Sequence, residues 1–245
     1  MIGKKHTLEE NLSYLRLTQI RDSYMEAADT AAKKNMSHID FLDELIGAET
    51  AARETNAVAR RLREARLPYS KTLEQFQWSH PEKINRQQIE NLFHLNFMEK
   101  KVNVVFLAGC GLGKTHLSIA LAAKACQEGY SVLFAGAVDI VNSLSAAKAV
   151  NGLEKELGRY TKVQLLVMDE LGFLPIDKLG ADLLFQVISK RYENGSMLIT
   201  CNKVFKKWAE IFNNDSTVTS AILDRVLHHC EPVVIEGKSY RMKDK

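Results

Sequence analysis

Two short polar segments of the sequence carry side chains suited to the chemistry of a nucleoside triphosphate. The first is Gly113-Lys114-Thr115, at the end of a glycine-rich turn, and the second is the acidic pair Asp169-Glu170. In the motif G-x-x-x-x-G-K-[ST], backbone N–H groups wrap the phosphates, the lysine reaches the β- and γ-phosphates, and the hydroxyl takes a place on Mg²⁺. The sequence therefore predicts a phosphate-binding loop with Lys114 and Thr115 in these roles.

The loop departs from the motif at its first position, where Ala108 replaces glycine. We expect Gly109 to supply the tight turn one position later, and alanine suffices where φ is negative. A strand-like run before the loop and a helix-like run after it disfavour the alternative, a turn that binds nothing. Cys110 is interpreted as a small filler. The expected nucleotide contacts are Gly109, Cys110, Gly111, Leu112, Gly113, Lys114, Thr115 and His116.

The acidic pair ends the apolar run "VQLLVMDELGF". In that position Asp169 would hold Mg²⁺ through water, and Glu170 would polarise the attacking water. The alternative is a strand that ends in two solvated acids. Glu170 separates the reaction classes, because a small-molecule kinase needs no base for water whereas a hydrolase does.

Two further residues are candidates for the hydrolytic step. Asn202 follows the strand-like run "SMLITC", which we expect to lie between the other two strands, so its amide would reach the γ-phosphate or the attacking water. The alternative for Asn202 is an ordinary turn residue. Arg225 lies in a helical stretch and would act across a subunit interface. Its alternative is a surface ion pair involving Asp224.

The elements that position these residues alternate between strand and helix. Apolar runs predict strands at residues 102–107, 131–135, 164–168, 197–201 and 232–235. Continuous apolar strands with helices between them indicate a parallel sheet covered on both faces. Residues 1–66 instead predict a bundle of two to four helices, beginning at a capping box over residues 7–10. We expect domains at residues 1–70 (helical), 71–100 (linker and connecting helix) and 101–245 (α/β).

Composition is that of an ordinary globular protein, with 46% hydrophobic and 26% charged residues and a net charge of +3. The four cysteines are far apart, which disfavours disulfides and zinc. No apolar run approaches the ~20 residues that span a bilayer, and no secretory leader is expected, so we predict a cytoplasmic protein. Trp208 and Phe212 are expected in the core. His228 and His229 are not expected to bind metal, since adjacent histidines on a helix point apart.

Several longer stretches, "LGKTHLSIALAAKA", "LLVMDELGF", "SMLITCNKVFKKWAEIF" and "AILDRVLHHCEPVVIEGKSYRMK", carry a family resemblance. The sequence resembles the IstB-type ATPases, the helper proteins of insertion sequences, and more distantly the DnaC helicase loaders and DnaA initiators of the AAA+ superfamily. The resemblance implies an AAA+ P-loop core with a missing or vestigial C-terminal lid. It also implies that Arg225 acts in trans and that Arg241 is a second arginine that senses the nucleotide.

The function implied by the resemblance is ATP-dependent self-assembly on duplex target DNA, largely independent of base sequence, with presentation of that DNA to a transposase. ATP and Mg²⁺ are the implied cofactors. The candidate DNA-binding residues are Arg60, Arg61, Arg63, Arg66, Lys148, Lys155 and Arg159, with a solvated surface as the alternative. Spacings of three and six would place Arg60, Arg63 and Arg66 on one side of a helix. The rival functions are a helicase loader, a small-molecule kinase and an ATPase that binds nucleotide without turnover.

Overall fold

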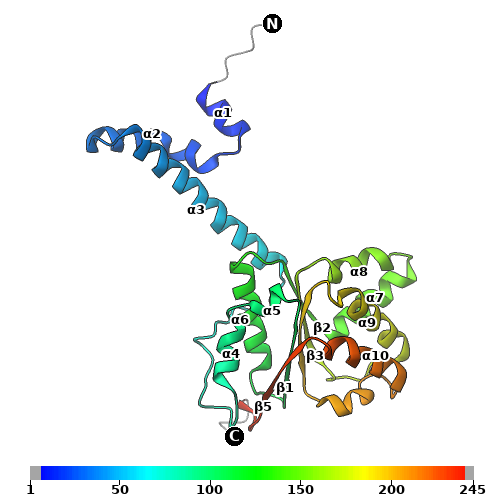
Figure 1. Ribbon diagram of the computed structural model, residues 1–245. Helices are drawn as coiled ribbons and strands as arrows, with labels where there is room; N and C mark the ends of the chain where they lie inside the picture. Colours follow the sequence, from blue (N-terminus) through cyan, green and yellow to red (C-terminus); the bar gives the residue numbers. More distant parts are fainter. Residues whose placement is uncertain (1–6, 241–245) are drawn as a thin grey trace. The chain divides into compact units, whose positions relative to one another are not determined.

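The computed structural model describes residues 7–240, which fall into two compact units that meet between Arg60 and Arg61. The first unit consists of helices, and the second contains the sheet (Figure 1). No helix in the described part of the chain is long and apolar enough to cross a membrane. The domain limits expected from the sequence stay a prediction.

The N-terminal unit is built from α1 (Leu8–Tyr14), α2 (Thr18–Lys34) and most of α3 (His38–Glu64). The expected capping box is present at Thr7, whose side chain accepts from the N–H of Glu10. A small apolar core is formed by Leu12, Ile20 and Leu45. The predicted bundle of helices is therefore confirmed.

One parallel sheet of five strands forms the centre of the second unit, in the order β2-β3-β4-β1-β5. The strands are β1 (Asn103–Ala108), β2 (Val132–Gly136), β3 (Leu165–Leu171), β4 (Ser196–Cys201) and β5 (Cys230–Ile235). Each overlaps a strand predicted from the apolar runs, and β4 lies between β1 and β3 as expected. Strand β3 runs three residues beyond its predicted end, because the acidic pair lies inside it and not after it.

Helices cover both faces of the sheet (Figure 1). One face packs against α4 (Arg86–Leu92), α5 (Asn96–Glu99) and α6 (Lys114–Gln127). The other packs against α7 (Ala137–Ala149), α8 (Leu153–Thr161), α9 (Lys178–Arg191), α10 (Ser216–Leu227) and the 3₁₀ helix η1 (Phe205–Glu210). Trp208 and Phe212 are fully buried in this second layer, as predicted. Residues 236–240, after β5, form no α-helix. The expected lack of a lid stays a prediction.

The segment between α3 and α4 is held against the sheet at both of its ends. At its start, the N–H of Phe134 in the edge strand β2 donates to the carbonyl of Ala65 at 2.8 Å. At its end, Lys83 forms an antiparallel bridge with Glu236, just beyond β5. We call residues 66–83 the connector. Because it is tied to the sheet at both ends, its side chains have defined positions at the carboxyl edge of the strands.

A buried arginine fixes the turns that lead into β3 and β4. Arg191 is 1% exposed, and its guanidinium donates to the carbonyls of Tyr160, Val163, Gln164 and Ser196. Its burial lowers its pKa to about 10. A charged group that gives up water needs such hydrogen bonds, so this guanidinium joins the end of α8 to the starts of two central strands.

His228 and His229 lie close together, contrary to the prediction that they point apart. Helix α10 ends at Leu227, so the two residues do not follow helical spacing, and their ring centroids lie 4.1 Å apart. The Nε2 atom of His229 lies 3.8 Å from a carboxylate oxygen of the exposed Glu193. The prediction is wrong because helical spacing does not continue past Leu227.

Candidate functional site

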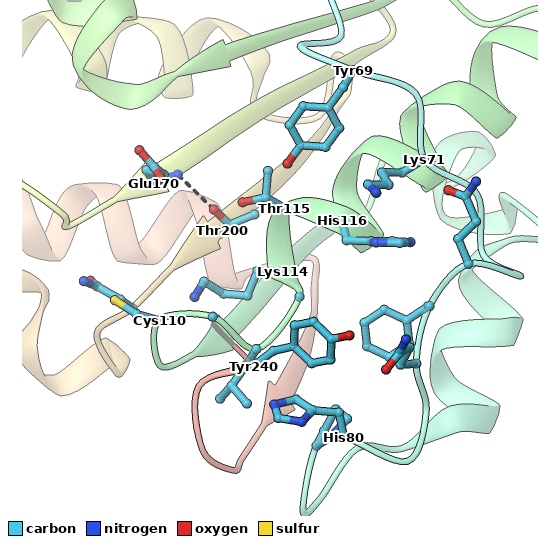
Figure 2. A pocket seen from close by; sticks show the side chains of 18 of the residues that line it. Tyr69, Lys71, His80, Cys110, Lys114, Thr115, His116, Glu170, Thr200 and Tyr240 are labelled. Carbon is cyan, nitrogen blue, oxygen red and sulfur yellow. Dashed lines mark hydrogen bonds between the residues drawn. The ribbon is translucent and has the colours of Figure 1, made fainter. Parts of the chain in front are cut away.

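A cleft of about 500 Å³ lies at the carboxyl ends of β1, β3 and β4 (Figure 2). Its floor is the loop between β1 and α6, at residues 110–115. One wall carries Glu170, Thr200 and Asn202 from the sheet, and the other is formed by the connector. The carboxyl edge of a parallel sheet is where such folds bind their ligands, so the topology brings the predicted loop, acid and amide together.

The loop makes its turn with two glycines in the left-handed region, Gly111 at φ 73° and Gly113 at φ 84°. A Cβ atom on Gly113 would lie 2.5 Å from the ring of Phe76, and one on Gly111 would collide with Ser239. Alternation of left- and right-handed residues turns successive N–H groups inward, which is the geometry of an anion-binding nest. Ala108 and Gly109 have no positive φ. The turn expected at Gly109 is therefore made later in the loop, and Ala108 ends β1 without strain.

Lys114 and Thr115 open helix α6 with their side chains directed to the loop and to β3. The Lys114 ammonium donates to the carbonyls of Ala108 at 2.8 Å and Gly109 at 2.7 Å. Partial burial lowers the pKa of this amine. The Thr115 hydroxyl lies 3.1 Å from both carboxylate oxygens of Asp169. A cation and a hydroxyl–carboxylate pair thus face one small volume above the loop.

The acidic pair sits at a bulge in β3, where the register with β4 shifts between Met168 and Leu171. Glu170 adopts a left-handed φ of 60°, so the two acids do not simply alternate across the strand. Asp169 is buried toward Thr115, while Glu170 is exposed in the cleft. Strain of this kind in a non-glycine residue costs about 1–3 kcal/mol and concentrates at functional sites.

Thr200 holds this arrangement together and was missed by the sequence analysis. Its hydroxyl donates to Asp169 and accepts from the N–H of Glu170 at 2.9 Å (Figure 2). The signal was available, because Thr200 is a polar residue near the carboxyl end of a mostly apolar strand that neighbours the acidic one. Asn202 lines the cleft two residues further on, as predicted for its position.

The connector was also missed as part of the site. Its side chains Tyr69, Lys71, Phe76 and His80 line the cleft. Figure 2 shows Tyr69, Lys71 and His80 on the connector side of the loop. The Nε2 atom of His116 donates to the carbonyl of connector residue Thr72 at 2.8 Å. Burial lowers the pKa of His116. The sequence signal for this wall was the pair of aromatic residues Tyr69 and Phe76, which lie between two helices.

The segment after β5 completes the connector side of the cleft. The N–H of Tyr240 donates to the carbonyl of Gly111 at 3.0 Å, and its ring packs edge-on against His80 with centroids 4.8 Å apart. Tyr240 therefore links the phosphate-loop turn to the connector. Arg241, expected to sense the nucleotide, lies outside the described residues.

Arg225 lies away from the cleft of its own chain. Its guanidinium is 4.8 Å from the ring centroid of Phe185 and donates to the carbonyl of Ala221 in α10. Within residues 7–240, neither Asp224 nor Arg225 forms an ion pair, so the structure does not support the surface-pair alternative. None of the described residues that line the cleft is an arginine.

The candidate DNA-binding residues divide into two groups. Arg61, Arg66 and Arg159 line a second cavity, of about 250 Å³, whereas Arg60, Arg63, Lys148 and Lys155 are exposed and do not line it. The expected single helical face is wrong for Arg66, because α3 ends at Glu64 and Arg66 has a left-handed φ of 55°. The chain turns away after the helix, so Arg66 reaches the same cavity as Arg61.

The cleft is suited to a polyphosphate bound with a hard divalent cation. The glycine nest and Lys114 favour the anion, and the Thr115 and Asp169 oxygens are ligands of the kind that Mg²⁺ prefers. The residues present therefore fit the nucleotide and metal that the loop motif implies. The sheet is parallel in the order β2-β3-β4-β1-β5, the phosphate-binding loop follows β1, and the acidic pair lies on β3. Together these features define a P-loop ATPase core.

Comparison with known proteins identifies the family. The model described as IstB-like ATP binding protein matches residues 10–245. The chain is 39% identical over 240 residues to the insertion sequence IS21 putative ATP-binding protein of Pseudomonas aeruginosa, covering 98% of this chain and 90% of that protein. It is also 39% identical over 237 residues to the IS232 putative ATP-binding protein of Bacillus thuringiensis, covering 97% and 94%. The chain belongs to the IstB-like ATP binding protein family and is an ATPase.

Solved structures agree in fold. The DnaI structure has a TM-score of 0.58 at 20% identity, covering 72% of this chain and 93% of that one. AMPPCP-bound DnaA from Aquifex aeolicus has a TM-score of 0.57 at 21% identity, covering 70% of this chain and about half, 51%, of that one. At these identities the likeness shows the fold of the core alone.

Proposed function

We propose that this ATPase uses ATP binding to assemble on duplex target DNA and presents that DNA to a partner transposase, and that hydrolysis controls disassembly. The observation that supports the hydrolytic part is the arrangement at the β3 bulge. Asp169 is buried against Thr115, while Glu170 is exposed in the same cleft. The family membership, among ATP-binding proteins of insertion sequences, supports the transposition context.

The residues of the cleft divide the chemistry among them. ATP phosphates would contact the N–H groups of residues 109–115 and the Lys114 ammonium. On binding, this ammonium would exchange its hydrogen bonds to the carbonyls of Ala108 and Gly109 for contacts with the phosphate oxygens. Thr115 and Asp169 would hold Mg²⁺, which supplies charge stabilisation to the phosphates. Glu170 would accept a hydrogen bond from the attacking water and so orient it. The side-chain amide of Asn202 would contact the γ-phosphate or the same water.

A neighbouring copy of the chain would complete the cleft. Charge develops on the transferred phosphoryl group, and an arginine brought to it is worth a large rate factor. The described cleft residues include no arginine, and Arg225 lies outside its own cleft. We therefore assign Arg225 to the cleft of an adjoining protomer in a homo-oligomer, with residues 1–70 contacting DNA and partner proteins.

An electrophoretic shift assay tests the DNA part of the proposal. We expect a labelled duplex to shift with a non-hydrolysable ATP analogue and not with ADP, and a scrambled duplex to shift equally, because phosphate contacts carry no base information. A preference for single strands, or a shift that ignores the nucleotide, would contradict the proposal.

The protein partner is tested separately. Tagged protein, loaded on duplex with the ATP analogue, should retain an insertion-sequence transposase and not a replicative helicase. Retention of the helicase alone would favour the helicase-loader alternative.

A further inference from the structure

The second cavity gathers basic side chains that are far apart in the sequence. Arg61 and Arg66 come from the end of α3 and the residues after it, and Arg159 comes from α8. Ser131 and Val163, which also line it, precede β2 and β3. The cavity therefore lies at the amino ends of these parallel strands, whereas the nucleotide cleft lies at the carboxyl ends. We call it the arginine groove.

Backbone contacts fix both sides of the arginine groove. On one side, the carbonyl of Ala65, next to Arg66, accepts from the N–H of Phe134 in β2. On the other side, the buried Arg191 donates to the carbonyls of Tyr160 and Val163, which flank the end of α8. The arginines are thus presented by anchored backbone, which reduces the entropy lost when they bind a ligand.

The charges of the arginine groove do not cancel. Arg61 donates to the carbonyl of Cys126 at 3.0 Å, a contact that leaves its charge uncompensated. Arg66 has no hydrogen bond or ion pair from its side chain within residues 7–240, and it is exposed. Arg159 pairs with Glu156 at 3.0 Å, and Glu64 also lines the cavity. Three guanidinium groups against two carboxylates leave a positive surplus at an open surface.

The lining selects a class of ligand. Guanidinium groups match phosphate oxygens in a bidentate manner. No aromatic side chain lines the cavity among the described residues, so nothing there would stack on a base, and its volume is half that of the nucleotide cleft. A backbone phosphodiester satisfies these features better than a second free nucleotide does.

We propose that the arginine groove binds phosphodiesters of the DNA backbone, through Arg61, Arg66 and Arg159, at the end of the sheet opposite the nucleotide. The inference rests on the proposed binding of duplex DNA and specifies where the backbone is held. It also replaces the single helical face expected from sequence with a site built from two segments. Contacts of this kind position DNA without reading its sequence.

The test is duplex affinity, measured by fluorescence anisotropy with the full chain and a non-hydrolysable ATP analogue over a range of salt. The double variant Arg66→Ala with Arg159→Ala should bind at least ~10-fold more weakly, and its salt slope should fall by about 1–2, since each phosphate contact contributes about 0.9. Arg61 is left intact because it also bonds Cys126. The charge-preserving pair Arg66→Lys with Arg159→Lys should recover most of the affinity, which separates lost charge from a folding defect.

The double variant Lys162→Ala with Lys178→Ala is the matched control. It also removes two positive charges, both from exposed side chains, and neither residue lines the cavity. It should stay within about 3-fold of wild type. If it weakens binding as much as the double groove variant does, or if the groove variant binds like wild type, the inference is overturned while the proposed function stands. If wild type binds no duplex in any nucleotide state, the proposed function fails and the inference with it.

Discussion

The hydroxyl of Thr115 lies 3.1 Å from both carboxylate oxygens of Asp169, although the two residues are 54 positions apart. The first residue opens α6 directly after the glycine nest, and the second is buried at the bulge of β3. Thr200 shares the same carboxylate from the strand between β3 and β1. Three elements therefore converge on one group of oxygens.

Asp169→Asn should abolish Mg²⁺-dependent hydrolysis, by at least ~100-fold in kcat, because one anionic ligand is lost at the position of greatest charge. The amide still accepts from Thr200, so the fold should persist. Steady-state phosphate release measures the effect, and Asp182→Asn, an exposed acid on α9, is the control that should stay within about 2-fold. Full activity in Asp169→Asn would show that the Asp169 carboxylate is not needed for hydrolysis.

Gly113→Ala should weaken ATP binding at least ~10-fold, because a left-handed alanine is strained by roughly 1–2 kcal/mol and its Cβ would meet Phe76. Gly109→Ala should cost far less, since the nearest side-chain atom to its Cβ is 3.7 Å away and its φ is not positive. Titration of a fluorescent ATP analogue compares the two. Equal losses would show that the nest at Gly111 and Gly113 does not hold the phosphates.

Arg191→Met should lower the free energy of unfolding by at least ~3 kcal/mol, since each buried carbonyl left without a donor costs about 1–3 kcal/mol. Lys190→Met breaks only an exposed ion pair with Glu154 and should cost under ~1 kcal/mol. Urea unfolding of both variants gives the comparison. A small loss in Arg191→Met would mean that water replaces the guanidinium.

Acid should destabilise the protein in part through His116. Burial lowers the pKa of this imidazole, against the hydrogen bond to Thr72 that raises it. The unfolded chain then binds the proton more readily, so this contribution to stability is complete above about pH 6.5 and is lost as the pH falls toward the folded pKa. His116→Gln, which keeps a donor for Thr72, should lose less stability than wild type between about pH 7.5 and about pH 5.5. Identical losses in urea unfolding would contradict this.

Much of the core was predictable because its signals are local. The apolar runs gave all five strands, since a strand buried on both faces has no polar residues to interrupt it. Lys114 and Thr115 were recognisable from the loop motif, and Asn202 from its place after a strand. Each of these inferences needs only neighbouring residues in the chain.

The features that were missed depend on contacts across the chain. The role of Thr200 becomes visible only once β3 and β4 are paired. The connector joins the cleft through contacts with residues far away in the chain, such as His116 and Glu236. The errors at Arg66 and His228 have one cause, because both extended helical spacing beyond the last residue of a helix. Helix ends are the least reliable part of any periodicity argument.

The most direct test of the account is the lifetime of ATP-dependent assemblies of Glu170→Gln on duplex DNA, followed by electron microscopy and phosphate release. If Glu170 orients the attacking water, the variant should bind ATP, hydrolyse it at least ~100-fold more slowly, and form assemblies that outlast those of wild type. Wild-type assemblies should disperse as ATP is consumed. If the variant assemblies form and disperse like those of wild type, and phosphate release is unchanged, the claim that hydrolysis in this cleft controls assembly is contradicted.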